Sequence, residues 1–176
     1  KGELKRIPVP TTPTAPEHER YNLLRRTPAG TFLLALRAEK AFIEIDETGK
    51  ELWRHPVPEL PVVAERLANG NTLVSGYRPA SLTEFDPAGT VVWTLTAADL
   101  PAALNINSFC EATRLANGNT LIACASRGAK PGERVVLLEV SPGKQVVWKQ
   151  MEASRAHRRL RGHSHEGNNA QRDRVE

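Results

Sequence analysis

The sequence predicts an all-β fold assembled from repeated sheets, and three copies of one motif lead to that prediction. Residues 66–74 read Arg-Leu-Ala-Asn-Gly-Asn-Thr-Leu-Val, and residues 114–122 repeat this stretch almost unchanged. A fainter copy surrounds Gly30. Asn-Gly between alternating apolar residues is a strong hairpin signal and predicts a two-residue type I′ turn. A hairpin that recurs at this spacing indicates a repeat architecture.

The second half of each repeat carries its own pattern, in which a Glu precedes a Trp by nine residues. The pairs are Glu44 and Trp53, Glu84 and Trp93, and Glu139 and Trp148. A glycine turn lies between the members of each pair. Gly143 falls one place early in the third copy, which predicts a different turn there. Because the three Glu residues occupy equivalent strands of different units, we expect them to be structural rather than a pair of catalytic carboxylates.

Each repeat contains four short strands, which in the second unit we expect at 62–67, 72–77, 81–85 and 90–95. The first two strands join at the Asn-Gly turn, and the last two join at the Asp-Pro-Ala-Gly turn, where Pro and Gly are favoured. A short helix is possible between Thr96 and Leu104. Four antiparallel strands in about 40 residues, with one Trp on the last, are typical of a β-propeller blade.

The repeat boundaries predict the domain organisation. Residues 1–10 resemble residues 49–58, and residues 2–6 are therefore expected to form the last strand of a preceding blade. Residues 151–176 lack the repeat pattern and have the low hydrophobicity of a disordered tail. The expected parts are a strand and connecting loop at 1–19, a body at 20–150 with blades at about 20–55, 62–100 and 109–150, and a basic tail at 151–176.

Three blades and one strand do not close a ring, because propellers typically have four to eight blades. The predicted fold is therefore a β-propeller fragment that is marginally stable or aggregation-prone alone. The third unit also carries a seven-residue insertion around 126–132, which is expected to form an exposed loop.

The distribution of charge argues against nucleic-acid binding. The net charge is +4, yet residues 21–150 contain 14 Lys and Arg against 13 Asp and Glu. The basic excess lies in the ends, whereas a nucleic-acid-binding face needs it clustered on the fold. No apolar run is long enough to span a membrane.

The histidines and cysteines do not form a recognisable catalytic or metal motif. A two-residue turn at Asn117-Gly118 would place Cys124 opposite Glu111, with the sulfurs of Cys110 and Cys124 on opposite faces of the sheet. We therefore expect two small buried or half-buried thiols, although a slipped register would permit a disulfide. His55 is expected to be an exposed loop residue. The His-x-His pair of the tail, His163 and His165 with His157 nearby, is expected to be incidental.

The repeat unit resembles the blades of bacterial propellers related to quinoprotein (PQQ-like) and arylsulfotransferase proteins. The resemblance covers about residues 21–149 and implies an exported, extracytoplasmic protein. It implies that the tryptophan of each blade packs on the neighbouring blade and that the glycine turn allows close approach. The positions that match this pattern are Trp53, Trp93 and Trp148, with Gly49 and Gly89 in the turn. The hairpin glycines Gly30, Gly70 and Gly118 are expected to be structural because of their own turns.

The catalytic features of these enzymes have no counterpart here. No adjacent cysteine pair that would stack a quinone cofactor is present, and segments 58–64 and 103–113, which correspond to the histidine-bearing segment of arylsulfotransferases, contain no His. No cofactor or metal is evident. A base recurs in the loop after the second strand of each blade, at Arg37, Arg78 and Arg127, and these residues are candidates for an anion-binding rim.

The sequence therefore favours a non-catalytic propeller segment that acts as a binding or scaffold module. Its expected partners are the remaining blades of the same propeller and a small anionic or carbohydrate ligand. Two alternatives remain open. One is a fragment of a propeller enzyme of the arylsulfotransferase or quinoprotein dehydrogenase type, and the other is a carbohydrate- or surface-binding repeat.

Overall fold

The computed structural model describes residues 6–126, 128–130 and 132–152, and in this part the chain is nearly all β. Three four-stranded antiparallel sheets account for the fold, which confirms the predicted architecture. Within each sheet, neighbouring strands are consecutive in the chain, so each repeat forms one sheet. The expected tail and its three histidines lie almost entirely outside the described residues.

The three sheets, which we call blades 1 to 3, each contain four strands that follow one another in the chain. Blade 1 contains β1 (Leu24–Arg26), β2 (Phe32–Leu36), β3 (Ala41–Ile45) and β4 (Glu51–Pro56). Blade 2 contains β5 (Pro61–Arg66), β6 (Thr72–Gly76), β7 (Ser81–Phe85) and β8 (Val91–Thr96). Blade 3 contains β9 (Ser108–Arg114), β10 (Thr120–Ala125), β11 (Val135–Val140) and β12 (Val146–Met151). The short α1 (Glu17–Arg20) precedes blade 1, and two 3₁₀ turns, Ala97–Asp99 and Ala102–Leu104, follow blade 2.

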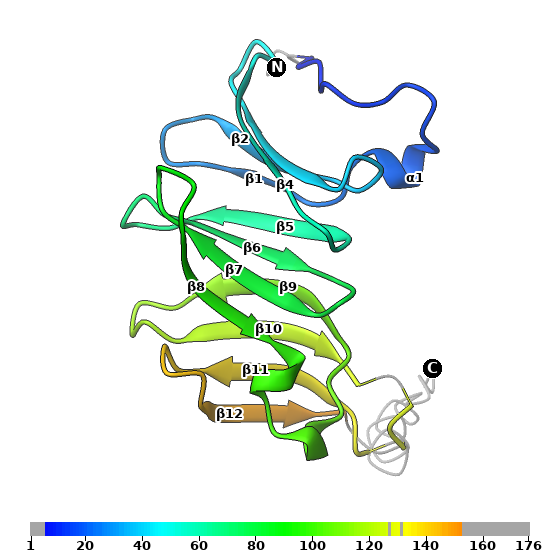
Figure 1. The fold of residues 1–176 in the computed structure, drawn as a ribbon, viewed down its shortest axis with the longest axis vertical. Helices are drawn as coiled ribbons and strands as arrows, with labels where there is room; N and C mark the ends of the chain where they lie inside the picture. The colour runs from blue at the N-terminus through cyan, green and yellow to red at the C-terminus, as the bar shows by residue number, and fades with distance from the viewer. Residues whose placement is uncertain (1–5, 127, 131, 153–176) are drawn as a thin grey trace, which may run out of the picture.

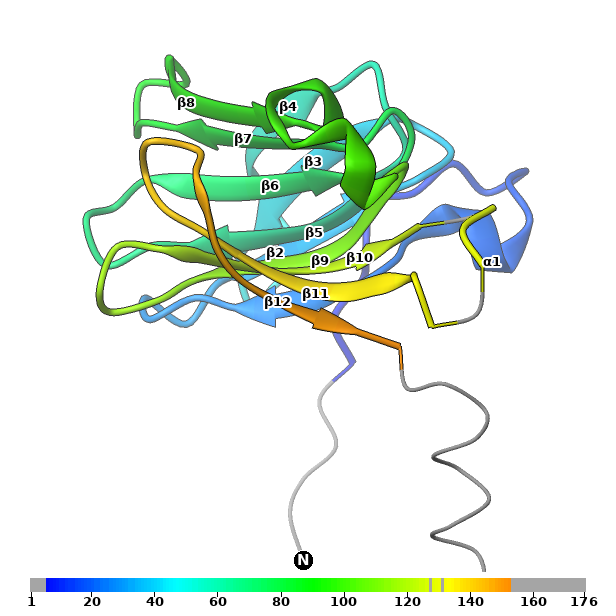
Figure 2. The ribbon, with the colours of Figure 1, turned by 90° about the horizontal axis from the view of Figure 1, so that it is seen from below.

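The blades lie face against face in a row along the long axis of the molecule (Figures 1 and 2). Their first strands, β1, β5 and β9, lie side by side, so that they form the inner edge of the array. The loops that follow the second strand of each blade lie on the same side of the molecule, on the right in Figure 1. This arrangement brings residues that are 40 to 50 positions apart in the chain to equivalent places.

The core consists of the layers between the blades. Leu33, Ala35 and Phe42 of blade 1 pack against blade 2 in one cluster, and Leu73 and Leu82 of blade 2 pack against blade 3 in another. Both faces of β2 and β6 are therefore buried, whereas β10 alternates between buried and half-buried residues. Strands buried on both faces lose the simple alternation of polar and apolar residues, as the sequence shows in these strands.

The first hairpin turn of each blade differs from the prediction. The Leu67 carbonyl accepts from the Gly70 amide at 3.0 Å, and the Leu67 amide donates to the Asn71 carbonyl at 2.8 Å. Only Gly70, at φ +87°, has left-handed backbone, and Asn69 does not. The prediction of a type I′ turn is therefore wrong, and the loop is a three-residue type I turn with a glycine bulge. Asn69 is used differently, because its Oδ1 accepts from the Asn71 amide at 3.0 Å.

The altered turn also changes the register of blade 3. Thr120 faces Arg114, one position away from the predicted pairing, and a bulge then places Cys124 opposite Phe109 rather than Glu111. The two cysteines do not form a disulfide. Cys124 is buried and Cys110 is half-buried, as the sequence predicted.

The last turn of blade 3 was expected to differ from its counterparts, but its hydrogen bonds are the same. The Ser141 carbonyl accepts from the Lys144 amide at 2.9 Å, as the Asp46 and Asp86 carbonyls accept from their glycines. Lys144 takes the left-handed position at φ +64° that Gly49 occupies in blade 1. The glycine shift in the sequence is thus absorbed by one strained residue and not by a new turn.

The segment before blade 1 packs onto the outer face of that blade. Ile7 and Val9 contact the cluster of Leu34, Leu36, Ile43 and Ile45. In the aligned segment, Trp53 and Val57 contact the core between blades 1 and 2. Residues 6–10 therefore cover blade 1 in the way that the end of β4 and the residues after it cover blade 2.

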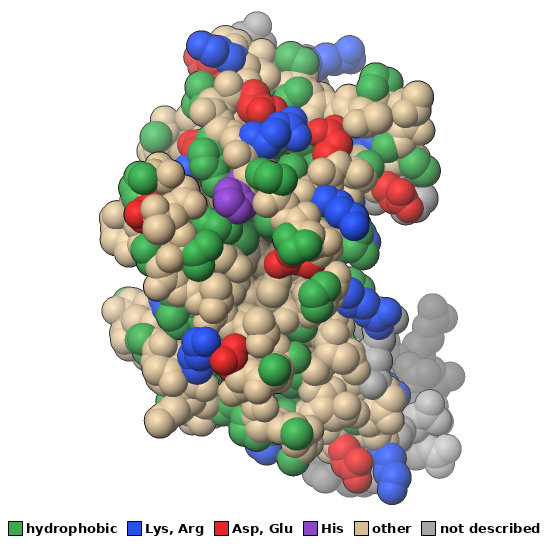
Figure 3. All heavy atoms as spheres, in the orientation of Figure 1, with side chains coloured by type: hydrophobic (Ala, Val, Ile, Leu, Met, Phe, Trp, Pro, Cys, Tyr) green, Lys and Arg blue, Asp and Glu red, His purple; other side chains and the backbone are tan. Residues whose placement is uncertain are grey.

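The face of the molecule shown in Figure 3 has no strong segregation of charge. Lys and Arg side chains alternate with Asp and Glu side chains over the face in Figure 3. Within the described residues, no helix has the length and apolar character needed to cross a membrane.

Candidate functional site

The repeated glutamates are the acceptors of a hydrogen-bond network that joins the blades. Glu84 accepts from Asn71 of its own blade through Oε1, at 2.7 Å, and from Arg114 of blade 3 through Oε2, at 2.5 Å. Glu44 repeats this division, because Oε1 accepts from Thr31 and Oε2 accepts from Arg66 of blade 2. The glutamates therefore have a structural position at the blade interfaces.

The arginine of each interface also holds its own turn. Arg114 donates to the Gly118 carbonyl at 3.1 Å, and its guanidinium lies 4.9 Å from the centre of the Trp93 ring. Trp93 in turn donates from Nε1 to the Pro142 carbonyl of blade 3 at 2.9 Å. Trp93 is thus placed against the following blade by a hydrogen bond and by a stacked cation.

The other two structural tryptophans differ in their surroundings. Trp53 packs beside the core between blades 1 and 2, and its ring stacks on His55 with centres 5.8 Å apart. Trp148 lies on the last strand of blade 3 and is 46% exposed. The five structural glycines have nearly the same φ, between +85° and +88°, at Gly30, Gly49, Gly70, Gly89 and Gly118.

A cavity of about 190 Å³ lies among the inner strands at the loop side of blades 1 and 2, and it contains a residue of the predicted rim. Its lining comprises Asn22, Arg37, Val62, Tyr77 and Cys110, which come from all three blades or the segments beside them. Backbone hydrogen bonds assemble it. The Asn22 amide donates to the Ala35 carbonyl at 2.8 Å, and the Tyr77 amide donates to the Leu60 carbonyl at 2.8 Å.

One polar atom of the residues that line this cavity has no hydrogen-bond partner within the described chain. The Arg37 Nε atom is buried and has no hydrogen-bond partner among the described residues. A buried donor without a partner costs free energy, so Arg37 is a candidate residue for binding an acceptor. The tyrosine and the asparagine add polar groups beside this guanidinium.

The predicted rim is only partly assembled. Arg37 lines the cavity, and the Arg78 guanidinium lies 5.4 Å from the centre of the Tyr77 ring, which belongs to the same lining. Arg78 is not itself a lining residue. Arg127 lies outside the described residues.

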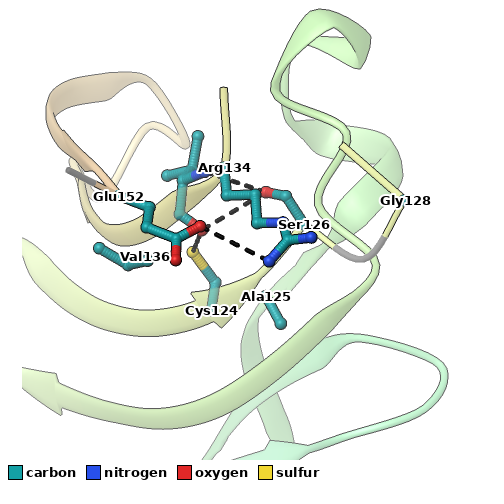
Figure 4. A pocket seen from close by; sticks show the side chains of 8 residues that line it. Cys124, Ala125, Ser126, Gly128, Arg134, Val136 and Glu152 are labelled. Atoms are coloured by element: carbon teal, nitrogen blue, oxygen red, sulfur yellow. Dashed lines mark hydrogen bonds and ion pairs between the residues drawn. The ribbon is translucent and has the colours of Figure 1, made fainter. Parts of the chain in front are cut away.

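A larger cavity of about 340 Å³ lies beside the inserted loop of blade 3 (Figure 4). Ser126 Oγ accepts from the Val135 amide at 3.2 Å and donates to the Leu104 carbonyl at 3.1 Å. At the mouth, Arg134 and Glu152 form an ion pair at 3.6 Å. These contacts join Ser126, the residues before β11 and the end of β12. The Ser126 hydroxyl is engaged in hydrogen bonds to backbone groups.

The cysteine of this cavity is not an activated nucleophile. Burial, with a smaller effect of Cys110, raises the pKa of the Cys124 thiol to about 12. The thiolate, which is the reactive form, is therefore scarce at neutral pH. Cys124 Sγ instead points to the Val135 carbonyl at 3.8 Å.

His55 and Glu59 form a feature that the sequence did not reveal. His55 lies on β4 and is half-buried, with its ring centre 3.9 Å from that of Phe85, so the expectation of an exposed loop residue is wrong. Burial lowers the pKa of His55, and the nearby Glu59 partly opposes this effect. A half-buried imidazole between two aromatic rings thus favours its neutral form.

Glu59 is a buried carboxylate in a proline-rich connection. It is 8% exposed, its Oε1 accepts from Ser81, and its Oε2 has no hydrogen-bond partner among the described residues. Gly76 leaves room for it, because a Cβ there would lie 2.1 Å from Glu59 Cγ. The only available signal was a charged residue among Pro56, Pro58 and Pro61.

No group of three or more His, Cys, Asp or Glu side chains in the described chain is placed to hold a metal ion. The tail histidines, His157, His163 and His165, lie outside that part.

Comparisons with known proteins identify the fold. No protein-family model matches the chain, and no curated protein matches its sequence. A solved protein of unknown function from Bacteroides caccae matches with a TM-score of 0.66 and 19% identity, over 77% of this chain and 50% of that one. Virginiamycin B lyase from Staphylococcus aureus matches with a TM-score of 0.55 and 10% identity, over 78% and 42% of the two chains.

A third solved structure extends the same result. The calcium-binding protein regucalcin from Agrobacterium tumefaciens matches with a TM-score of 0.52 and 19% identity, over 74% of this chain and 43% of that one. These structures are β-propellers, so the three sheets are propeller blades. The chain spans half or less of the length of each of the three. At these identities the likeness shows the fold alone.

Proposed function

We propose that this chain is a non-catalytic β-propeller segment, of the PQQ-like or arylsulfotransferase-like type, that acts as a binding module for a small anion. The observation that carries the proposal is Arg37, which lines a cavity of about 190 Å³ and whose buried Nε atom has no hydrogen-bond partner among the described residues. The lining also includes Asn22 and Tyr77, whose side chains can donate hydrogen bonds. The ligand is a small anion such as sulfate or a carboxylate.

The shape and chemistry of arginine favour this ligand class. A guanidinium presents several N–H donors in a fixed plane and matches the paired oxygens of a carboxylate or a sulfate. In a partly buried position, a charge-assisted hydrogen bond is stronger than at the surface. The cavity is also small, which suits a compact anion.

A binding role fits the described chemistry better than catalysis does. The Cys124 thiol is protonated, and the Ser126 hydroxyl is held by backbone groups. His55 packs between Trp53 and Phe85 and is not a lining residue of the Arg37 cavity. The propeller-enzyme and the carbohydrate-binding alternatives have no specific observation in their favour.

The test is calorimetric titration of the full chain with sodium sulfate and sodium acetate, with sodium chloride at matched ionic strength as reference. Arg37→Gln removes the charge and is expected to weaken binding by roughly 10- to 100-fold, because a charged hydrogen bond contributes about 1.5–3 kcal/mol. Arg26→Gln removes an exposed charge of β1 and is expected to leave binding unchanged.

Two further results would contradict the proposal. One is equal heats for sulfate, acetate and chloride, and the other is undiminished binding by an Arg37→Gln variant whose thermal unfolding matches the parent. Arg78→Ala tests the rim separately. Unchanged affinity in that variant would restrict the site to the Arg37 cavity.

A further inference from the structure

The exposed face of blade 3 contains one half of an interface that occurs twice within the structure. At each occupied interface the glutamate of one blade divides its two oxygens. Oε1 accepts from Thr31 or Asn71 within the blade, and Oε2 accepts from the arginine of the following blade, Arg66 or Arg114.

The third glutamate has the same arrangement with one oxygen unused. Glu139 Oε1 accepts from Asn119 at 2.7 Å and from Asn117 at 3.3 Å. No described residue donates to its Oε2. Asn119 therefore holds the Glu139 carboxylate as Asn71 holds Glu84. Oε2 of Glu139 corresponds to the oxygen of Glu84 that accepts from Arg114.

The apolar residues of this face are also equivalent to those of the two occupied interfaces. Leu121, Ala123 and Leu137 align with Leu33, Ala35 and Phe42 of blade 1, which are fully buried under blade 2. In blade 3 these three residues are half-buried and line a depression of about 170 Å³. Trp148, which aligns with the arginine-covered Trp93, is 46% exposed.

We propose that this face, defined by Glu139, Trp148, Leu121, Ala123 and Leu137, docks a further propeller blade whose first strand ends in an arginine with a glycine four residues later. The incoming arginine donates to Glu139 Oε2 and to the carbonyl of its own glycine, and its guanidinium lies over the Trp148 ring. The match is one of charge as well as shape, since a carboxylate oxygen without a donor among the described residues and an exposed indole face both attract a guanidinium.

The occupant is a following blade rather than the first blade of a second copy. A second copy would have to place the outer face of its own blade 1 against the exposed face of blade 3. Ile7 and Val9 already cover Leu34 and Ile43 on that outer face. At the interface of blades 1 and 2, the end of β4 and the residues after it take the equivalent place. Docking of a second copy would have to displace this segment.

The inference rests on the proposal that the chain is part of a larger propeller, but not on anion binding. The probe is a cyclised 16-residue peptide with the sequence of residues 61–76, the hairpin of β5 and β6. This hairpin carries Arg66 and Gly70, and at the occupied interfaces β5 packs on β2 as β9 packs on β6. Cyclisation is needed because an isolated hairpin is marginally stable in water.

Fluorescence anisotropy of the labelled peptide with the full chain measures the binding. We expect saturable binding that Glu139→Gln weakens by about tenfold or more, because the charge-assisted hydrogen bond is lost. A peptide with Arg66→Met should lose affinity to the same extent. Glu17→Gln removes an exposed carboxylate of α1 and should have no effect.

Three results of the peptide experiment would overturn the inference. They are absence of saturable binding, equal binding by the parent and the Glu139→Gln variant, and equal binding by the Arg66→Met peptide. A concentration-dependent dimer of the full chain that Glu139→Gln abolishes would instead identify a second copy as the occupant and would refute the assignment to a following blade. Sulfate titration of the same preparations reports on Arg37 separately, so the two proposals fail independently.

Discussion

Replacement of Arg114 by Met tests whether the repeated ion pair joins the blades. Arg114 contacts the Glu84 carboxylate at 2.5 Å, the Gly118 carbonyl at 3.1 Å and the face of the Trp93 ring. The side chains of Arg114 and Glu84 are only 17% and 10% exposed, so solvent screens the pair weakly. Met keeps much of the length and apolar area of the arginine stem but leaves the carboxylate without its cationic partner.

The expected loss of stability follows from these contacts. A hydrogen bond to a charged group contributes about 1.5–3 kcal/mol, and a cation over an indole contributes about 0.5–1 kcal/mol. Because Asn71 still donates to Glu84, the loss should be about 2–4 kcal/mol, below the upper range for breaking a fully buried pair. For a domain of this size, the midpoint of thermal unfolding should fall on the order of 10 °C.

The assay is urea unfolding of the full chain, followed by tryptophan fluorescence, with thermal unfolding as a second measurement. Arg26→Met is the matched control, because Arg26 occupies the aligned position in β1, is exposed and has no ion-pair partner among the described residues. Its effect should stay within about 0.5 kcal/mol. The reasoning is refuted if Arg114→Met costs no more than Arg26→Met. It also fails if a double-mutant cycle with Glu84→Gln shows no coupling.

Two further predictions concern the packing of the first segment and the pH response. Gly49 and Gly89 have φ of +88° and +86°, but a Cβ at Gly49 would lie 2.3 Å from the Pro8 carbonyl oxygen, whereas a Cβ at Gly89 meets nothing within 4 Å. Gly89→Ala should therefore cost about 1 kcal/mol for its left-handed backbone, and Gly49→Ala should cost more; equal urea midpoints would show that residues 6–10 do not pack on blade 1. Burial lowers the pKa of His55 in the folded chain, so the unfolded state binds more protons below pH of about 6.5. The stability that His55 contributes should be fully present above that pH and should be lost as the pH decreases through the lower folded pKa. His55→Phe should therefore reduce the pH dependence of the urea midpoint between pH 5 and 7.5. An unchanged pH dependence in this variant would assign the effect to other titratable groups.

The fold could be predicted well because the responsible signals are local and repeated. The Asn-Gly turns, the later glycine turns and the Glu-to-Trp spacing each occur within one blade, so a pattern of few residues determines each strand and turn. In the second unit, each end of the four expected strands lies within one residue of the observed end. The errors in the turns have a physical cause, because both a type I′ turn and a bulged type I turn use Asn-Gly. A type I′ turn requires left-handed backbone angles at Asn69. In this structure Asn69 does not adopt them, and its side chain accepts a hydrogen bond from the Asn71 amide instead.

The sequence predicted much less of the candidate site than of the fold. Arg37 belongs to a loosely aligned set of loop bases, but nothing local indicated that it would line a cavity with Tyr77 of the next blade or that its Nε would be buried. Glu59 was missed because its burial depends on Gly76 and Ser81, which lie on other strands. Such environments arise from residues that meet only after the blades have stacked.

By itself, the sequence determined the all-β class, the number of blades described here and the positions of their turns, because these depend on short-range backbone preferences repeated along the chain. Only the tertiary structure decided how the repeated charges are used. Glu84 and Arg114 are 30 residues apart, and their pairing depends on the distance and angle between two stacked sheets. Burial has the same origin. Leu33 and Leu121 occupy equivalent positions, yet within the described residues another blade packs against Leu33 and not against Leu121.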